Sequence, residues 1–205
     1  MLAAAPRILA KAAHASRRPL RPLRSVSLLA VAVLGSVACG PAPPPTLPSD
    51  NSLTVALESA PIHLDPRVAS DQASSKVFEL AMNGLVTKDE NGTFVPDLAQ
   101  SWEFLEEGRR WRFHLRPGVR FHDGRPFGAD DVVFTYGSFL DGSITSPKKG
   151  AFAALARVEK VDDATVDFVM KEPNGTMLGN LTAYVAVVPA GRTPDEQNRQ
   201  PIGTG

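Results

Sequence analysis

The sequence predicts a mixed α/β fold whose middle part is mostly antiparallel, and three observations support this prediction. Turn residues at Asn91-Gly92, Gly108 and Asp162-Asp163 each separate two apolar stretches, which is typical of β-hairpins. Apolar residues at helical spacing follow Asp71 and Gly128. Of the 205 residues, 43% are hydrophobic and 21% are charged, as expected for a chain that folds around a core.

Residues 1–38 are predicted to be a signal peptide of the lipoprotein type. A basic head leads into an apolar run of thirteen residues, 26–38, which is too short for a bilayer core that needs about 20. The only cysteine, Cys39, follows directly, and the surrounding sequence S-V-A-C-G resembles a bacterial lipobox, in which this thiol is lipidated. A plain signal peptide with a chance cysteine is the alternative, because Ser36 stands where a lipobox usually has leucine. With one cysteine, no intrachain disulfide can form.

Residues 39–52 are predicted to be a proline-rich tether. Residues 40–52 contain five prolines, and proline lacks a backbone donor and fixes φ, so neither a helix nor a sheet ladder is expected there. An extended segment of this length spans roughly 40 Å at most. Such a spacer suits a folded part that stands off a membrane.

The charge distribution argues against a nucleic-acid partner. The whole chain has 22 basic and 22 acidic residues, but residues 1–38 hold six of the basic residues and no acid. The remaining 16 basic and 22 acidic residues give a net charge of −6. Because phosphate neutralisation supplies most of the affinity for nucleic acid, no nucleic-acid binding is expected.

The folded part is predicted to begin with a strand, a loop, a helix and a hairpin. Residues 53–59 alternate enough to form a strand, and the proline-bounded residues 60–66 form a loop. Residues 71–84 place apolar side chains on one helical face, and Asn83-Gly84 ends this helix. The first hairpin covers residues 85–96.

Two more hairpins and a further helix are predicted downstream. The second hairpin covers residues 101–115 and the third covers residues 158–173. A helix is expected over residues 174–181, and the apolar run 184–188 is predicted to be a strand.

Gly128 is predicted to cap a helix between the second and third hairpins. Asp130 and Asp131 fall in its first turn, where the helix dipole favours acidic residues. The buried stripe of this helix is predicted to consist of Val132, Val133, Tyr136, Phe139 and Leu140.

Residues 113–134 raise the question of a catalytic or metal centre, because they bring His114, His122 and Asp123 together in the sequence. A hairpin with a three-residue loop closed by Gly118 would pair Phe113 with Phe121 and match the apolar faces. Moving the loop by one residue would set His114 opposite His122, a pair that could hold a metal. That register also opposes two arginines, so the first register is expected and no metal site is predicted.

The sequence lacks the common catalytic motifs. The sequence has no G-x-S-x-G, no H-E-x-x-H, no phosphate-binding loop and no cysteine nucleophile within its folded part. His63 lies in the proline-bounded loop, where a lone histidine is more often structural. No catalytic residue and no cofactor are therefore predicted.

Several segments resemble the successive signatures of the family 5 extracellular solute-binding proteins, which are the peptide-, oligopeptide- and nickel-type receptors of bacterial ABC importers. The most specific are L-R-P-G-V-R-F-H-D-G-R-P and the A-x-D-V-x-F pattern that follows it. Gly128 departs from the pattern, because the family usually has threonine before this helix. The resembling segments are residues 53–71, 83–104, 111–139, 158–178 and 201–205.

The resemblance implies a periplasmic-binding-protein type II-like fold with two lobes joined by a hinge. Residues 53–205 would then be a partial solute-binding domain, namely the first lobe with an inserted hairpin-rich α+β subdomain at about residues 68–189. The second lobe is expected to be missing. The resemblance places the binding cleft at two segments, the loop after the first strand and the final turn. Their candidate ligand-binding residues are Glu58, Ser59, Ala60, Pro61, His63, Gly203 and Thr204.

The implied function is that of the substrate-binding component of an ABC importer. It would capture a peptide-like solute outside the cytoplasmic membrane and deliver it to the permease, without binding ATP itself and without being an enzyme. It would be periplasmic or on the cell surface, anchored by lipidated Cys39. The alternatives are a receptor for nickel or another small solute, a surface lipoprotein for adhesion, signalling or chaperoning, and a metal-dependent enzyme built on His114, His122 and Asp123.

Overall fold

The structure, a computed structural model, describes residues 54–205, except for the side chains of Ala183 and Tyr184. The predicted signal peptide, the tether and Cys39 lie outside the described residues. Within residues 54–205, no helix combines the length and apolar character needed to cross a bilayer.

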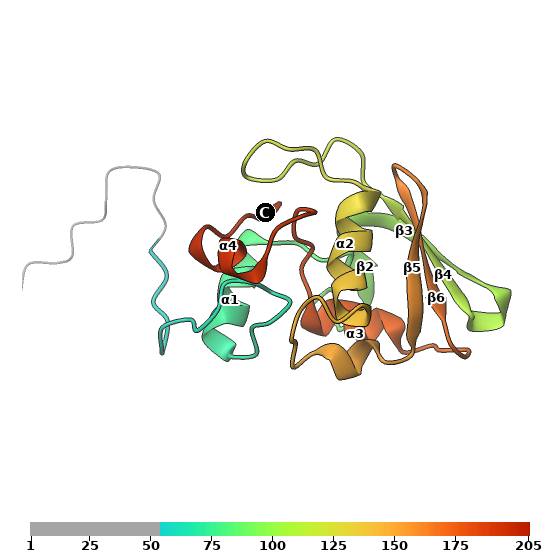
Figure 1. The fold of residues 1–205 in the computed structure, drawn as a ribbon, viewed down its shortest axis with the longest axis horizontal. Coiled ribbons are helices and arrows are strands. Elements are labelled where there is room, and N and C mark those ends of the chain that lie inside the picture. The colour runs from blue at the N-terminus through green and yellow to red at the C-terminus, as the bar shows by residue number, and fades with distance from the viewer. Residues whose placement is uncertain (1–53) are drawn as a thin grey trace, which may run out of the picture. The chain divides into compact units, whose positions relative to one another are not determined.

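The described chain is a mixed α/β structure with two antiparallel sheets (Figure 1). Helices α1 and α4 lie at one end of the molecule and the larger sheet lies at the other. The elements in chain order are α1 (Gln72–Ala81), β1 (Val86–Lys88), β2 (Phe94–Pro96), β3 (Ala99–Leu105), η1 (Glu106–Gly108), β4 (Arg110–Leu115), α2 (Ala129–Leu140), η2 (Lys149–Phe152), β5 (Leu155–Asp162), β6 (Thr165–Met170), α3 (Met177–Tyr184) and α4 (Pro194–Arg199).

The three predicted hairpins are confirmed. Strands β1 and β2 form a two-stranded sheet, and β3–β4 and β5–β6 are antiparallel pairs within a four-stranded sheet of order β3-β4-β6-β5. The bends fall where the turn residues predicted them. Gly108 has a φ of 94°, a conformation that glycine adopts without the strain of a side chain.

The predicted pairing of residues 113 and 121 is wrong. Both edges of β4 are occupied, because Phe113 is opposite Trp102 of β3 on one side and opposite Val166 of β6 on the other. His114 is likewise flanked by Ser101 and Thr165, so the alternative pairing with residue 122 is also absent. The chain leaves the sheet after Leu115, and residues 116–127 form turns closed by a single antiparallel bridge between Arg120 and Pro126, not a further strand of the sheet.

The main core lies between the four-stranded sheet and α2. Alternate residues of β4 are buried, as expected for a strand with one face on a core. Phe168 of β6 contacts both Phe113 and Tyr136, with ring centroids 5.1 and 4.9 Å apart. Helix α2 begins after Gly128 as predicted, and Val132, Tyr136 and Phe139 of its predicted stripe are at most 1% exposed. Val133 and Leu140 are partly buried against the same core.

The opposite face of this sheet carries charged side chains. Asp167 of β6 accepts hydrogen bonds from Arg112 Nε at 2.8 Å and from Arg110 Nη1 at 2.9 Å. Asp167 itself is buried, and a buried charge needs a partner. The two arginines compensate its charge. The buried carboxylate on this face therefore has its hydrogen-bond partners without an apolar covering layer.

Two predicted strands are not formed within the described residues. Residues 54–57 are in no sheet. The apolar run after α3 is buried but irregular. Side chains of α2, not a neighbouring strand, form hydrogen bonds with the backbone here. Thr135 Oγ1 accepts a hydrogen bond from the backbone N–H of Val188 at 3.1 Å, and just beyond the run Asp131 Oδ1 accepts one from Ala190 at 2.8 Å. These bonds satisfy buried backbone groups without a ladder.

Candidate functional site

The first candidate segment, residues 58–63, lies against the first half of α1. Glu58, Ser59, Ala60 and His63 are exposed, and Pro61 is half-buried. The backbone N–H of His63 donates to Ser74 Oγ at 3.3 Å. Helix α1 is capped at this end by Asp71, whose Oδ1 accepts the backbone N–H of Ser74 at 2.8 Å. The segment is thus tethered through its backbone while most of its side chains face solvent.

The second candidate segment, residues 203–205, lies against the other end of α1. Gly205 N–H donates to the carbonyl of Ala81 at 3.3 Å, and Thr204 Oγ1 donates to Asn83 Oδ1 at 3.0 Å. A Cβ atom at Gly203 would stand 2.2 Å from the carbonyl oxygen of Ala81. Only a residue without a side chain fits this approach.

The two candidate segments therefore share one helix but do not meet at one point. The first contacts the helix near Ser74 and the second near Ala81. At 1.5 Å per residue, these contacts are roughly 10 Å apart along the helix axis. A ligand that touched both would have to be extended along α1.

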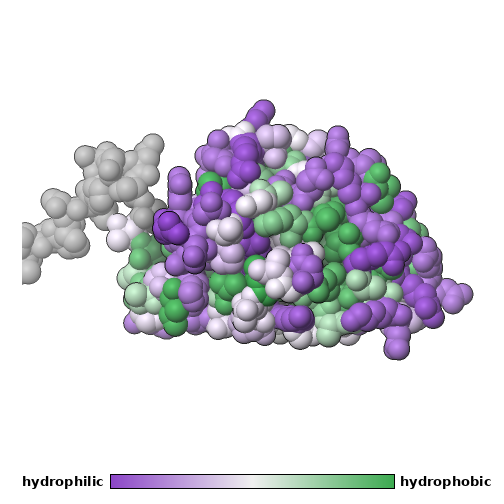
Figure 2. Space-filling view, viewed as in Figure 1, coloured by the Kyte–Doolittle hydropathy of each residue, from purple (hydrophilic) through white to green (hydrophobic). Residues whose placement is uncertain are grey.

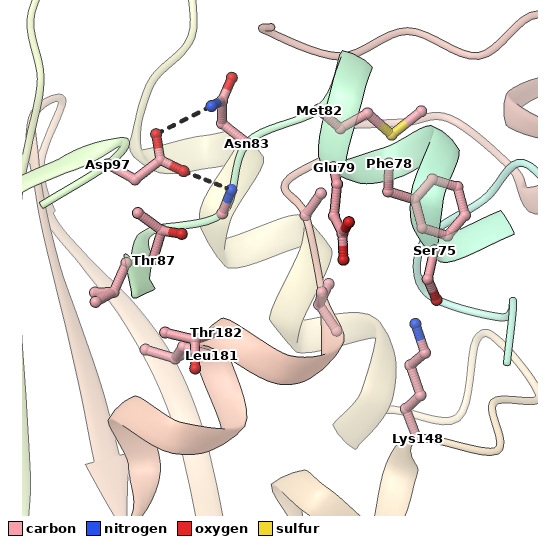
Figure 3. Close-up of a pocket in the computed structure, with 14 residues that line it drawn as sticks. Ser75, Phe78, Glu79, Met82, Asn83, Thr87, Asp97, Lys148, Leu181 and Thr182 are labelled. Carbon is pink, nitrogen blue, oxygen red and sulfur yellow. Dashed lines mark hydrogen bonds between the residues drawn. The ribbon is translucent and has the colours of Figure 1, made fainter. Parts of the chain in front are cut away.

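A pocket of about 350 Å³ lies beside the same helix (Figure 3). Its wall combines apolar and polar side chains from α1, β1, α3, the segment between β2 and β3, and the loop after α2. Its lining residues include Phe78, Glu79, Thr87, Asp97, Lys148 and Thr182. The volume falls within the range of small-molecule sites, which is about 300–1,000 Å³.

Asp97 forms the polar corner of the pocket. Its carboxylate accepts the side-chain N–H of Asn83 at 3.1 Å and the backbone N–H of Gly84 at 3.2 Å, as Figure 3 shows. Burial nevertheless raises the pKa of Asp97 above its ordinary value. Asn83 also accepts a hydrogen bond from Thr204, so the pocket and the second candidate segment are connected through one side chain.

Lys148 enters the pocket from the loop between α2 and η2, with its ammonium group directed toward α1 (Figure 3). Its Nζ donates to the carbonyl oxygen of Pro66 at 2.6 Å and lies 5.9 Å from the ring centroid of Phe78. Burial lowers the pKa of Lys148 to about 8. The pocket thus has a titratable cation on one wall and a carboxylate on another.

Sequence analysis did not identify Lys148 or Asp97 as site residues. Lys148 reaches a carbonyl 82 positions away in the chain, and nothing in its local sequence signals that contact. Asn83-Gly84 does carry a local sequence signal, but that signal predicts the end of a helix and not a pocket. The pocket arises from tertiary contacts between segments whose local patterns are ordinary.

The three residues of the enzyme alternative are engaged separately. His114 Nε2 lies 2.9 Å from Glu103 Oε1 on the charged face of the sheet. The ring of His122 contacts Gly203 and Gly205. Asp123 accepts the backbone N–H of Arg125 at 3.1 Å within its own turn. Among residues 54–205, no three histidine, cysteine or acidic side chains gather in a metal-binding arrangement.

Comparisons of this chain with known proteins all point to one family. Residues 93–205 match the model of the bacterial extracellular solute-binding proteins, family 5 Middle. The di/tripeptide-binding protein 3 of Pseudomonas aeruginosa (strain UCBPP-PA14) is 32% identical over 217 aligned residues, covering 92% of this chain and 39% of the relative. The chain therefore spans about two fifths of the length of this curated relative.

Solved structures resemble the described fold. The oligopeptide-binding protein AppA of Bacillus subtilis, in complex with a nonapeptide, has a TM-score of 0.65 at 30% identity, covering 71% of this chain and 31% of that one. NikZ of Campylobacter jejuni, in complex with Ni(L-His), has a TM-score of 0.64 at 28% identity, covering 73% and 31%. The mixed α/β chain thus corresponds to about a third of these binding proteins.

Proposed function

Because this chain belongs to the family 5 bacterial extracellular solute-binding proteins, which are binding proteins and not enzymes, we propose that it captures a peptide-like solute for an ABC importer. It would bind the solute outside the cytoplasmic membrane and present it to the permease subunits, which are its protein partners. ATP would be bound by other subunits of the transporter. Export by the signal peptide and anchoring by lipidated Cys39 belong to the same proposal.

The observation that carries the proposal is the arrangement of both candidate segments and the pocket along α1. An extended peptide can be held largely by main-chain hydrogen bonds, which tolerate many side chains. Residues 54–57 form no ladder with another strand of the described chain, and Glu58, Ser59 and Ala60, which follow them, are exposed. The roughly 10 Å between the two contacts on α1 corresponds to about three residues of extended chain.

The periplasmic-binding-protein type II-like first lobe, with its insertion at about residues 68–189, is part of this proposal. In a two-lobed receptor, closure is driven by contacts from both lobes to the ligand. The described chain would supply one set of those contacts. Its own affinity for peptides is then expected to be weak, with a dissociation constant on the order of millimolar.

Nickel or another small solute is the second candidate within the same class, and the likeness to NikZ favours it. The two are separated by titrating the chain, in parallel, with a dipeptide, a tripeptide, a free amino acid and the nickel–histidine complex. The tripeptide is expected to bind more tightly than the dipeptide and the free amino acid, because about three extended residues are needed to reach both contacts on α1. Tighter binding of the nickel complex than of any peptide would replace the proposal by the nickel alternative.

A further inference from the structure

The side-chain amide of Asn83 is bonded on both sides to other polar side chains. Its Nδ2 donates to Asp97 Oδ1 at 3.1 Å, and its Oδ1 accepts the hydroxyl of Thr204 at 3.0 Å. Asp97 is bonded a second time, because its Oδ2 accepts the backbone N–H of Gly84 at 3.2 Å. The row Asp97–Asn83–Thr204 therefore runs from the pocket to the second candidate segment, and Figure 3 shows its pocket end.

The direction of each hydrogen bond in this row follows from Asp97. An ionised carboxylate can only accept, so Asn83 must turn its NH2 group toward Asp97. The amide oxygen of Asn83 then faces Thr204, and the Thr204 hydroxyl must donate its single proton to that oxygen. The Thr204 oxygen is left with lone pairs and no proton to offer to a ligand. Among residues 54–205, no other group is bonded to that oxygen.

The surrounding backbone holds Asn83 in place. Its carbonyl accepts the N–H of Val187 at 2.9 Å, and the carbonyl of the neighbouring Gly84 accepts the N–H of Leu98 at 3.1 Å. All three side chains of the row are half-buried. Hydrogen bonds are electrostatically stronger where the local dielectric is low, so burial reinforces the row. Its direction is therefore set by the fold itself.

We propose that Asn83 is a positioning residue that fixes Thr204 as a hydrogen-bond acceptor, and that the Thr204 oxygen accepts a backbone N–H of the captured solute. The solute contact rests on the proposed function, in which the second candidate segment contributes to the binding site. A peptide offers an N–H at each amide bond, whereas an ester oxygen at the same place has no proton to donate. The row therefore favours amide-linked solutes at this position.

Replacing Asp97 by asparagine is expected to reverse the row. In Asp97→Asn the new amide oxygen is needed by the Gly84 N–H, so the new NH2 group faces Asn83. Asn83 must then turn its oxygen toward position 97 and its own NH2 group toward Thr204. Thr204 would accept from Asn83, and its hydroxyl proton would become available to a ligand. A side chain of almost unchanged shape thus converts the acceptor at Thr204 into a donor.

The first test needs no solute and uses the 205-residue chain at neutral pH. By NMR, the side-chain NH2 protons of Asn83 should show stronger nuclear Overhauser contacts to the β-protons of Asp97 than to the methyl group of Thr204. In Asp97→Asn the order of the two contacts should reverse. Stronger contacts to Thr204 in the unmodified chain would overturn the proposal.

The second test compares the binding of trialanine with that of two analogues, in each of which an ester oxygen replaces one amide N–H. One analogue is expected to bind the unmodified chain roughly fivefold more weakly, the size of one net hydrogen bond. Thr204→Val keeps the shape of the side chain without the hydroxyl, so the difference should be lost. It should also be lost in Asp97→Asn.

Two further variants serve as matched controls for the second test. Thr204→Ser keeps the hydroxyl, and Thr87→Val removes a hydroxyl from the pocket wall outside the row. Both should retain the roughly fivefold difference between trialanine and the weaker analogue.

An equal ester penalty in Thr204→Val and in the unmodified chain would overturn the role of Thr204. If trialanine binds and neither analogue is weakened, the inference fails while the proposed function stands. If no peptide affects residues 203–205, the proposed function fails and the solute contact fails with it, whereas the first test still decides the direction of the row.

Discussion

Arg67 and Asp65 form an ion pair in the interior, with Arg67 Nη2 at 2.6 Å from Asp65 Oδ2 and side chains that are 1% and 0% exposed. The guanidinium also donates to the carbonyl of Arg192 at 2.8 Å and lies 5.1 Å from the ring centroid of Phe134. This pair therefore joins the segment that follows the first candidate residues to the segment that leads into α4. It holds together the two parts of the chain that approach α1.

Replacing Asp65 by alanine leaves the buried Arg67 charge without its partner. We expect the free energy of unfolding to fall by about 3–5 kcal/mol, as for other broken buried pairs. Urea denaturation measures the change. The matched control is Glu58→Gln, which removes an exposed ion pair with Lys76 and should cost less than about 1 kcal/mol. Similar small losses in both variants would show that the buried pair does not join these segments.

The Arg110–Asp167–Arg112 cluster predicts how stability depends on acid. Burial by itself would raise the pKa of Asp167, but hydrogen bonds from Arg112 and Arg110 outweigh it and hold the pKa below the ordinary value of 3.8. The folded state therefore binds fewer protons than the unfolded state in this range. The stabilisation is present above pH 3.8 and is lost as the pH falls through the lowered pKa.

Asp167→Asn should flatten the loss of unfolding free energy toward acid, as measured by urea denaturation across this range. Asp97→Asn is the control, because it is expected to change the pH dependence of the unfolding free energy in the opposite direction. Burial raises the pKa of Asp97, so its contribution to stability falls as the pH rises through the range between 3.8 and that raised pKa. Its replacement should make the decline toward acid steeper. The same slope in both variants would contradict the assigned carboxylate environments.

Lys148 is expected to titrate near pH 8 because it is buried in the pocket. The lowered pKa means that the folded state binds fewer protons between about 8 and 10.5, so this residue makes stability rise with pH over that window. The chemical shift of its Cε, followed by NMR, gives the midpoint directly. Lys149, the exposed neighbour, is the internal comparison. A midpoint of Lys148 at or above its ordinary value of 10.5 would place its amine in solvent.

Gly203 is predicted to tolerate no side chain. In Gly203→Ala the new Cβ would meet the carbonyl oxygen of Ala81 at 2.2 Å and Met82 Cγ at 2.5 Å. We expect a loss of about 1–3 kcal/mol in the free energy of unfolding, or a displaced turn. Gly137→Ala in α2 meets nothing within 4 Å and should stabilise the helix by about 0.5–1 kcal/mol. Equal melting temperatures for the two variants would contradict the packed turn.

Local sequence patterns predicted the elements whose signals are local. Helix α1, the three hairpins, α2 and α3 follow from capping residues, turn residues and apolar spacing. Helix α4 was missed, although Thr193 and Glu196 form a capping box around Pro194 and could have indicated it. At six residues, it shows too little apolar periodicity to stand out.

The wrong predictions concern partners that lie far away in the sequence. Alternation in β4 shows which of its residues are buried, but not that β6 occupies the edge proposed for Phe121. The apolar run after α3 has the composition of a strand, yet its backbone N–H groups at Val187 and Val188 donate to Asn83 and Thr135 instead of to a neighbouring strand. The pocket was unpredictable for the same reason.

Exposed apolar side chains lie close to the proposed ligand site. Figure 2 shows hydrophobic residues on one face in several areas separated by hydrophilic ones. Among the exposed large hydrophobic side chains of the described chain, Ile62 is 69% exposed and Leu80 is 58% exposed. Ile62 belongs to the first candidate segment and Leu80 to α1, so apolar surface is available where the proposal needs it.

The most direct test of the central claim is to map the binding of a dipeptide and a tripeptide onto the ¹⁵N-labelled chain by NMR. The account predicts chemical-shift changes at residues 58–63, at residues 203–205 and along α1 between them, and none on the charged face of the sheet at Arg112. Shift changes confined to that sheet face, or none at either candidate segment under saturating peptide, would contradict it.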